Sequence, residues 1–181
     1  MTQPSHSGRF ARASRTLVSL VAFFLVAACT APAPEATPFR MKQAIPLGVV
    51  SLTVTSAKVV TIPPQPLGSL SALPGKKVIA VFVRVGGLKA LDVDGLGRRL
   101  FAEKLLEGRT TLSDAAGSLT KDGHAMPKGL YYGFGDMGGG QSSDFVIVFQ
   151  VPKESRDFTL LAENPEPQEG QPQLAAVALG L

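Results

Sequence analysis

KVIAVFVRV, residues 77–85, is predicted to be a β-strand in the middle of a sheet. Side chains alternate between the two faces of a strand. One face would hold Val78, Ala80, Phe82 and Arg84, and the other Ile79, Val81, Val83 and Val85. Because nearly all of these side chains are apolar, both faces of the strand should be covered, as in the centre of a β-sandwich. Gly86 and Gly87 mark its end.

Strands are also predicted on both sides of this segment. Residues 49–62 (VVSLTVTSAKVVTI) are rich in Val, Thr and Ile, and over residues 50–55 apolar side chains alternate with hydroxyl side chains. This is typical of a strand with one buried face, and prolines at 63, 64 and 66 end it. Later strands are expected at residues 144–151 (DFVIVFQV), 158–162 and 174–179. The last two are separated by a polar turn, NPEPQEGQPQ. Short strands with Gly/Pro-rich turns favour an antiparallel sandwich.

Residues 95–107 (GLGRRLFAEKLLE) change to helical spacing. The apolar side is predicted to be Leu96, Leu100, Phe101, Leu105 and Leu106, and the charged side Arg98, Arg99, Glu103 and Lys104. Asp94 is placed to cap the helix and Gly108 to end it. A polar hairpin with its turn at Ala116–Gly117 should follow over residues 109–120. One helix cannot supply the crossovers of a parallel α/β sheet. The fold class is therefore mainly β, with one short helical insertion near 95–107.

The N-terminal segment has the pattern of a secretory signal. Three arginines (Arg9, Arg12 and Arg15) and no acidic residue precede an uncharged run over residues 17–28. This run is too short to cross a bilayer core of about 30 Å as a helix. A signal peptide is therefore predicted over residues 1–28.

LVAAC, residues 25–29, resembles the lipobox of bacterial lipoproteins. The resemblance implies that a diacylglycerol is attached to the sulfur of Cys29, with acyl chains such as palmitate, and that the chain is cut just before it. The chain would then be anchored in the cell envelope, facing periplasm or exterior. The alternatives are an ordinary signal peptide cut at an A-x-A-like site, with Cys29 incidental, and an uncleaved anchor. Residues 29–42 would be a proline-rich tether and residues 43–181 a single β-sandwich domain.

Two further segments resemble the immunoglobulin-like domains of uncharacterised secreted bacterial lipoproteins. They are GKKVIAVFVRV at residues 75–85 and SSDFVIVFQVPKESRDFTLLAEN at residues 142–164. The resemblance implies an immunoglobulin-like sandwich in which Val151-Pro152-Lys153 joins two late strands. The helix predicted at 95–107 departs from that pattern, where such domains run through short strands and loops. No catalytic or ligand residue follows from the resemblance.

Composition excludes several classes of function. The chain has 18 basic and 14 acidic residues, but residues 1–28 hold three arginines and no acid, so 15 and 14 remain after processing. No basic field is left to attract nucleic acid. Cys29 is the one cysteine, so once it is lipidated no disulfide and no thiolate metal site can form.

Three motifs match a known binding pattern in part, and each has a simpler structural explanation. Residues 133–138 (GFGDMG) match G-x-G-x-x-G but lack a following helix, so a loop is expected there. Asp92–Glu103 resembles a calcium loop, but its fifth position is a leucine, so capping by Asp94 is preferred. His124, with Met126 and Met137, suits Cu(I), but no second histidine remains after processing, so a surface turn is preferred.

The sequence therefore predicts a protein that is not an enzyme and that needs no cofactor and no metal. His124 is the one histidine after processing, and no G-x-S-x-G or H-E-x-x-H motif is present. Tyr131 and Tyr132 are the predicted contact surface, unless they cover one end of the core. The expected function is protein binding or envelope organisation, with the membrane (through the lipid on Cys29) and an envelope protein as partners. The alternative is a lipoprotein that carries a small ligand or a metal.

Overall fold

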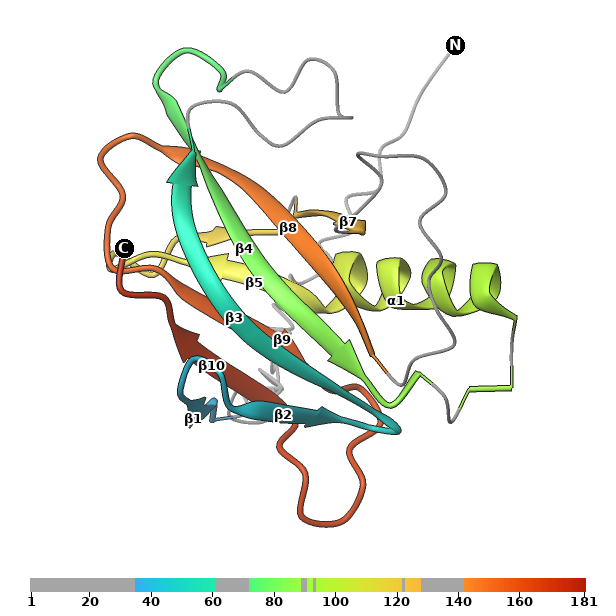
Figure 1. Cartoon of the computed structure of the whole chain (residues 1–181). Coiled ribbons are helices and arrows are strands. Elements are labelled where there is room, and N and C mark those ends of the chain that lie inside the picture. Colours follow the sequence, from blue (N-terminus) through green and yellow to red (C-terminus); the bar gives the residue numbers. More distant parts are fainter. Residues whose placement is uncertain (1–34, 61–71, 89–90, 93, 122, 128–141) are drawn as a thin grey trace, which may run out of the picture. The chain divides into compact units, whose positions relative to one another are not determined.

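A computed structural model describes residues 35–60, 72–88, 91–92, 94–121, 123–127 and 142–181 (Figure 1). These residues belong to one compact unit, which extends from Ala33 to Leu181. Its strands are β1 (Thr37–Phe39), β2 (Ala44–Leu47), β3 (Val50–Val60), β4 (Lys76–Gly86), β5 (Thr110–Ser113), β6 (Leu119–Thr120), β7 (His124–Pro127), β8 (Ser142–Pro152), β9 (Thr159–Glu163) and β10 (Leu174–Ala178), and its helix is α1 (Gly95–Arg109). No helix among these residues has the length and apolar character needed to cross a membrane.

The strands form two five-stranded sheets. We call them sheet A, in the order β1-β10-β9-β5-β6, and sheet B, in the order β2-β3-β4-β8-β7. The pairing of β1 with β10 is parallel, and the other pairs are antiparallel. Buried side chains of both sheets and of α1 form a single cluster between them. The prediction of a mainly β sandwich with one helix is confirmed.

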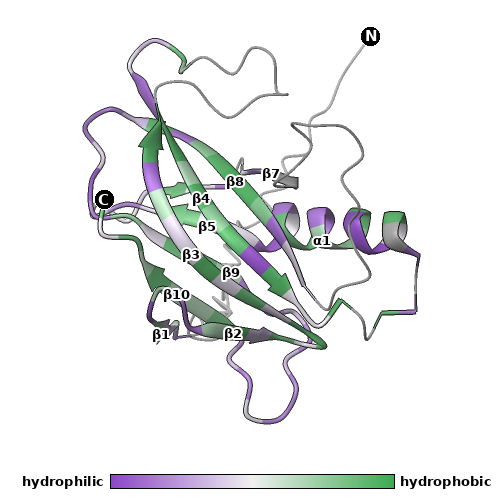
Figure 2. Cartoon of the chain, in the orientation of Figure 1, coloured by the Kyte–Doolittle hydropathy of each residue, from purple (hydrophilic) through white to green (hydrophobic). Residues whose placement is uncertain are grey.

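β4 lies at the centre of sheet B, between β3 and β8, as KVIAVFVRV predicts. Ile79, Val81 and the other side chains of their face are buried in the main core. On the opposite face Val78 and Ala80 form a second apolar cluster with Val146 and Val148 of β8. Figure 2 shows both strands as largely apolar bands. The predicted facing of β4 is therefore confirmed.

β3 has the predicted alternation over its first half. Val50, Leu52 and Val54 are buried, and the hydroxyl residues between them are half-buried. A bulge between Val54 and Ser56 then shifts the register against β4. At its start β3 passes close to Gly87, whose φ is +79° and where a Cβ atom would lie 2.7 Å from the carbonyl oxygen of Val49. Only glycine fits this close approach without strain.

Sheet A begins inside the segment that was expected to be a tether. Thr37–Phe39 forms β1, which pairs with the last strand of the domain, so the sheet starts before residue 43, the expected boundary. Pro38 is tolerated because β1 is an edge strand, where a missing N–H costs no ladder bond. The pairing is long-range in sequence, and nothing in TPF by itself indicates it.

α1 starts where the sequence predicts and ends later. The Asp94 carboxylate accepts a hydrogen bond from the N–H of Gly97 at 2.6 Å, which is an N-cap. The helix continues through Gly108, so the predicted end there is wrong. It stops at Thr110, whose backbone N–H and side chain both donate to the carbonyl of Leu106. Thr110 is also the first residue of β5. The helix ends here because Thr110 adopts an extended conformation and pairs with β9.

The predicted apolar face of α1 is correct in the later turns of the helix and wrong in its first turns. Ala102, Leu105 and Leu106 are buried in the core. Leu96, Leu100 and Phe101 are exposed by 64%, 48% and 40%. The helix contacts β7 and β9, and in Figure 1 its first turns extend past the strands, so only its later turns cover the core.

Candidate functional site

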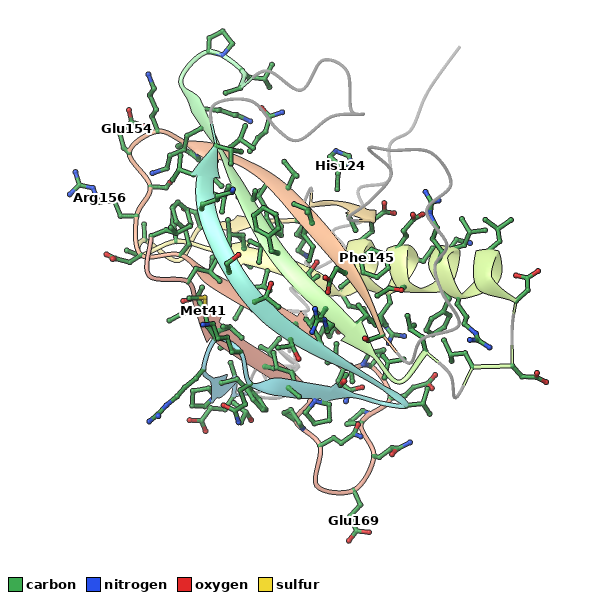
Figure 3. All side chains as sticks on the ribbon, viewed as in Figure 1. Met41, His124, Phe145, Glu154, Arg156 and Glu169 are labelled. Carbon is green, nitrogen blue, oxygen red and sulfur yellow. The ribbon has the colours of Figure 1, made fainter. Side chains whose placement is uncertain are left out.

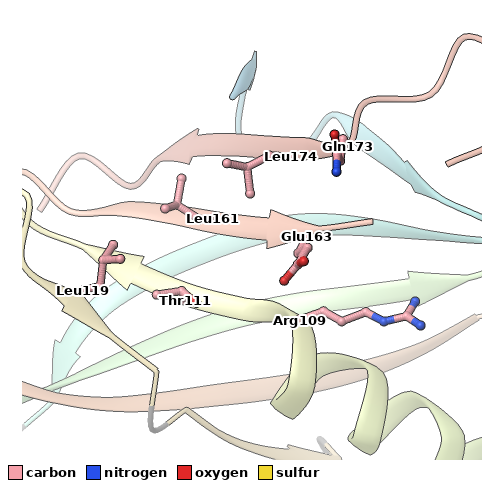
Figure 4. A pocket seen from close by; sticks show the side chains of 7 residues that line it. All are labelled: Arg109, Thr111, Leu119, Leu161, Glu163, Gln173 and Leu174. Carbon is pink, nitrogen blue, oxygen red and sulfur yellow. The ribbon is translucent and has the colours of Figure 1, made fainter. Parts of the chain in front are cut away.

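The described residues include a shallow pocket of about 240 Å³ on the outer face of sheet A (Figure 4). It is lined by Arg109, Thr111, Leu119, Leu161, Glu163, Gln173 and Leu174. These residues come from the end of α1, from β5, β6 and β9, from the start of β10 and, for Gln173, from the loop just before it. We call this site the outer pocket.

The outer pocket has an apolar end and a polar end. Figure 4 shows Leu119, Leu161 and Leu174 toward one end, and Arg109 and Glu163 toward the other. Its volume lies below the range of about 300–1,000 Å³ that is usual for small-molecule sites. A site of this size suits one or two side chains of a partner, with the leucines in apolar contact and the charged groups available for hydrogen bonds.

Alternation along β9 explains how the sequence builds this pocket. Leu160 and Ala162 point into the core, so Leu161 and Glu163 must point outward. On β10, Ala175 and Val177 are buried and leave Leu174 on the outer face. The apolar-polar alternation of a strand does not identify this site in the sequence, because an outward Leu161 next to an inward Leu160 breaks it. An apolar residue in the outward register of a short strand is the signal that could have found it.

A cluster of amide hydrogen bonds holds the loop that borders the polar end. The side chain of Gln171 accepts from the N–H of Gly48 at 2.9 Å and donates to its carbonyl at 3.0 Å. The same Gln171 oxygen accepts from the side-chain amide of Asn164 at 3.0 Å. Asn164 is 1% exposed, and its backbone N–H donates to the carbonyl of Gln173. We call this cluster the amide clamp. It ties the β2–β3 turn to the β9–β10 loop and so fixes the position of Gln173.

Asp114 organises the turn of the β5–β6 hairpin, which confirms the predicted turn. Its carboxylate accepts from the hydroxyl of Ser155 at 2.7 Å and from the N–H groups of Ser118 and Ala116. These hydrogen bonds, that from Ser155 first, lower the pKa of Asp114 below its ordinary value. The hairpin places Leu119 at the apolar end of the outer pocket.

The described residues do not form the calcium loop that residues 92–103 resemble in part, and Met137 of the copper candidate lies outside them. Asp94 caps α1, and Glu103 pairs with Arg99 at 3.0 Å, so the two do not form a calcium loop. The prediction that His124 lies in a surface turn is wrong. His124 begins β7, where it pairs with Val148. Its side chain is exposed, and Figure 3 shows it on the outside of the domain. Among the described residues no three His, Cys, Asp or Glu side chains gather around one point.

Other predicted site residues lie outside the described ranges. These are Cys29, Tyr131 and Tyr132, together with the glycine-rich segment 133–140. The lipidation site and the tyrosine contact surface therefore stay predictions.

Comparison with known proteins supports the fold. No protein-family model and no curated protein matches this sequence. An uncharacterised β-sandwich protein from Clostridium difficile 630 is similar in structure, with a TM-score of 0.50 and 9% identity over 81% of this chain and 96% of that one. A Bacillus subtilis protein described as a putative lipoprotein gives a TM-score of 0.45 and 12% identity, over 78% of this chain and 39% of that one. At 9% identity, the similarity to the Clostridium difficile protein defines the class of fold alone, which is a β-sandwich.

Proposed function

We propose that this chain is a non-catalytic, lipid-anchored protein of the bacterial cell envelope that binds a partner protein through the outer pocket. The anchor is the lipid on Cys29, and the domain faces periplasm or exterior. The observation that supports binding is the outer pocket itself, in which three leucine side chains lie on the solvent face of sheet A beside Arg109 and Glu163.

Two observations, one on the outer pocket and one on the edges of the sheets, favour a protein partner that binds the face of sheet A. Apolar side chains gathered beside charged groups are typical of the centre of a protein interface, where one or two residues contribute most of the affinity. The strands at the edges of the two sheets, β1, β6, β2 and β7, are two to four residues long, which leaves little edge for a partner to pair with. A partner is therefore expected to contact the face of sheet A. Tyr131 and Tyr132 stay a separate candidate contact.

The experiment compares two lipidated variants that receive the same charge on the same face. Leu161→Glu places a carboxylate inside the outer pocket, and Ala178→Glu places one on β10 outside it. Partners are captured from membranes by in-cell crosslinking, and quantified by mass spectrometry. We expect Leu161→Glu to lose the main crosslinked partner about tenfold, as for an interface residue that contributes more than about 1.4 kcal/mol. Ala178→Glu should keep it. Equal recovery with both variants would rule out the outer pocket as the binding site.

A further inference from the structure

Three large apolar side chains are exposed in one six-residue stretch of α1. They are Leu96, Leu100 and Phe101, and we call them the helix patch. Leu96 and Leu100 are four residues apart and therefore lie on the same side of the helix. The other large hydrophobic residues with exposed side chains, Met41, Val49, Val59, Leu73 and Leu119, are scattered over different segments. Single exposed residues are normal on protein surfaces, whereas a group calls for an explanation.

The start of the domain and the end of α1 lie in one row across sheet A. Thr37 is opposite Ala175, Ala175 is opposite Ala162, and Ala162 is opposite Thr110. This row contains three strand spacings, so Thr37 and Thr110 are about 14 Å apart. Leu96 is fourteen residues before Thr110, which adds at most about 21 Å of helix. The helix patch is therefore within about 35 Å of the point where the chain enters the sheet.

The chain between Cys29 and Thr37 is short. Its eight steps can span at most about 29 Å even when fully extended. A lipid on Cys29 would therefore hold Thr37 within that distance of the membrane surface. Since the helix patch lies no more than about 35 Å from Thr37, a rotation of the domain can bring it onto the membrane.

We propose that the helix patch rests in the interfacial layer of the membrane that holds the anchor, with Leu96, Leu100 and Phe101 among the lipid headgroups and upper acyl chains. This inference rests on the proposed lipid anchor. Three partly exposed side chains give a free protein little affinity for membranes. After anchoring, the contact is intramolecular, and a short linker gives an effective concentration on the order of mM.

Charge does not drive this contact. The helix and the residues before it, 92–109, contain four basic and four acidic side chains. Their charges cancel, so no net attraction to anionic lipid arises from this segment. Binding through apolar side chains should therefore be the same on zwitterionic and anionic vesicles, and should be insensitive to salt.

Tryptophan fluorescence tests the proposal, because the chain has no tryptophan of its own. The lipidated full chain carrying Phe101→Trp is placed in phosphatidylcholine vesicles, with or without bromine on the acyl chains, which quenches nearby tryptophan. Val59→Trp is the matched control, since Val59 is exposed by 52% on β3. We expect emission of the Phe101→Trp protein to fall about twofold, as for a side chain about 5–10 Å deep in the interface. The Val59→Trp protein should keep its emission.

A second pair of variants tests whether the helix patch acts as a unit. In the Phe101→Trp protein, Leu96→Glu should abolish quenching, whereas Leu73→Glu, at a residue exposed by 53% before β4, should leave it unchanged. The mass of the same sample reports the lipid on Cys29. Lipidated protein without quenching would overturn the membrane contact and leave the anchor intact. Protein without lipid would overturn both.

Discussion

Single polar residues hold the loops of this domain in place. In the amide clamp, the side chain of Gln171 exchanges two hydrogen bonds with the backbone of Gly48 in the β2–β3 turn of sheet B. The side-chain amide of Asn164 donates to the same Gln171 oxygen. Asp114 does the same for the β5–β6 turn by accepting three hydrogen bonds. The roles of these three residues could not be identified from the sequence, because their hydrogen-bond partners are distant along the chain or belong to the backbone.

Replacing Gln171 by alanine should destabilise the domain by about 1–3 kcal/mol, because buried Asn164 and the N–H of Gly48 lose a hydrogen-bond partner. Glu169→Ala is the control, since Figure 3 shows Glu169 at the tip of the same loop. Urea unfolding measures both free energies of unfolding. Equal values for the two variants would mean that the amide clamp contributes nothing to stability.

Asp114 should make stability depend on pH in acid. Its pKa is lowered in the folded state, so the folded protein binds this proton less readily than the unfolded chain does. The resulting stability is complete above the ordinary Asp pKa of about 3.9 and is lost as the pH falls below it, through the folded value. Urea midpoints between pH 6 and pH 2.5 should therefore fall less steeply for Asp114→Asn than for wild type. A slope for Asp114→Asn as steep as that of the wild type would contradict the assignment.

Elements with a strong internal pattern could be predicted, and those set by distant pairing could not. The alternation of Val50, Leu52 and Val54 and the apolar run of β4 gave their strands and facing correctly. β1 and β7 were missed because three or four residues hold no period, and their pairing with β10 and β8 makes them strands. The helix was found, but its buried face was not, since that face depends on where α1 ends against the core.

Phe149 tests the strand facing of sheet B. It is 0% exposed, lies opposite Ile79 and belongs to the core between the sheets. Phe149→Ala should cost about 3–5 kcal/mol of unfolding free energy, through lost burial and a cavity. Val59→Ala, at an exposed residue of the same sheet, should change it by less than about 0.5 kcal/mol. A cost below about 1 kcal/mol for Phe149→Ala would contradict this packing.

In the whole molecule, a sandwich domain follows a short segment that the proposed lipid on Cys29 would anchor. Sheet A begins at Thr37, eight residues after Cys29, so little free chain would separate the domain from its lipid. In the two proposals, the outer pocket on sheet A and the helix patch on α1 have different tasks, binding of a protein partner and contact with the membrane. The alternation of apolar side chains predicted the fold class, and the resemblance of residues 25–29 to a lipobox implies the anchor, which stays a prediction. They could not predict either surface, because both consist of apolar side chains that only the tertiary structure leaves outside the core.

The most direct test is the mass of the N-terminal peptide of the protein purified from membranes. We expect a chain that begins at Cys29, with a diacylglycerol on its sulfur and acyl chains as the added mass. Only the thiol can be alkylated by the lipid donor, so Cys29→Ser should remain an unlipidated precursor with residues 1–28 still attached. A wild-type chain that starts at another residue, or that carries an unmodified Cys29, would contradict the account.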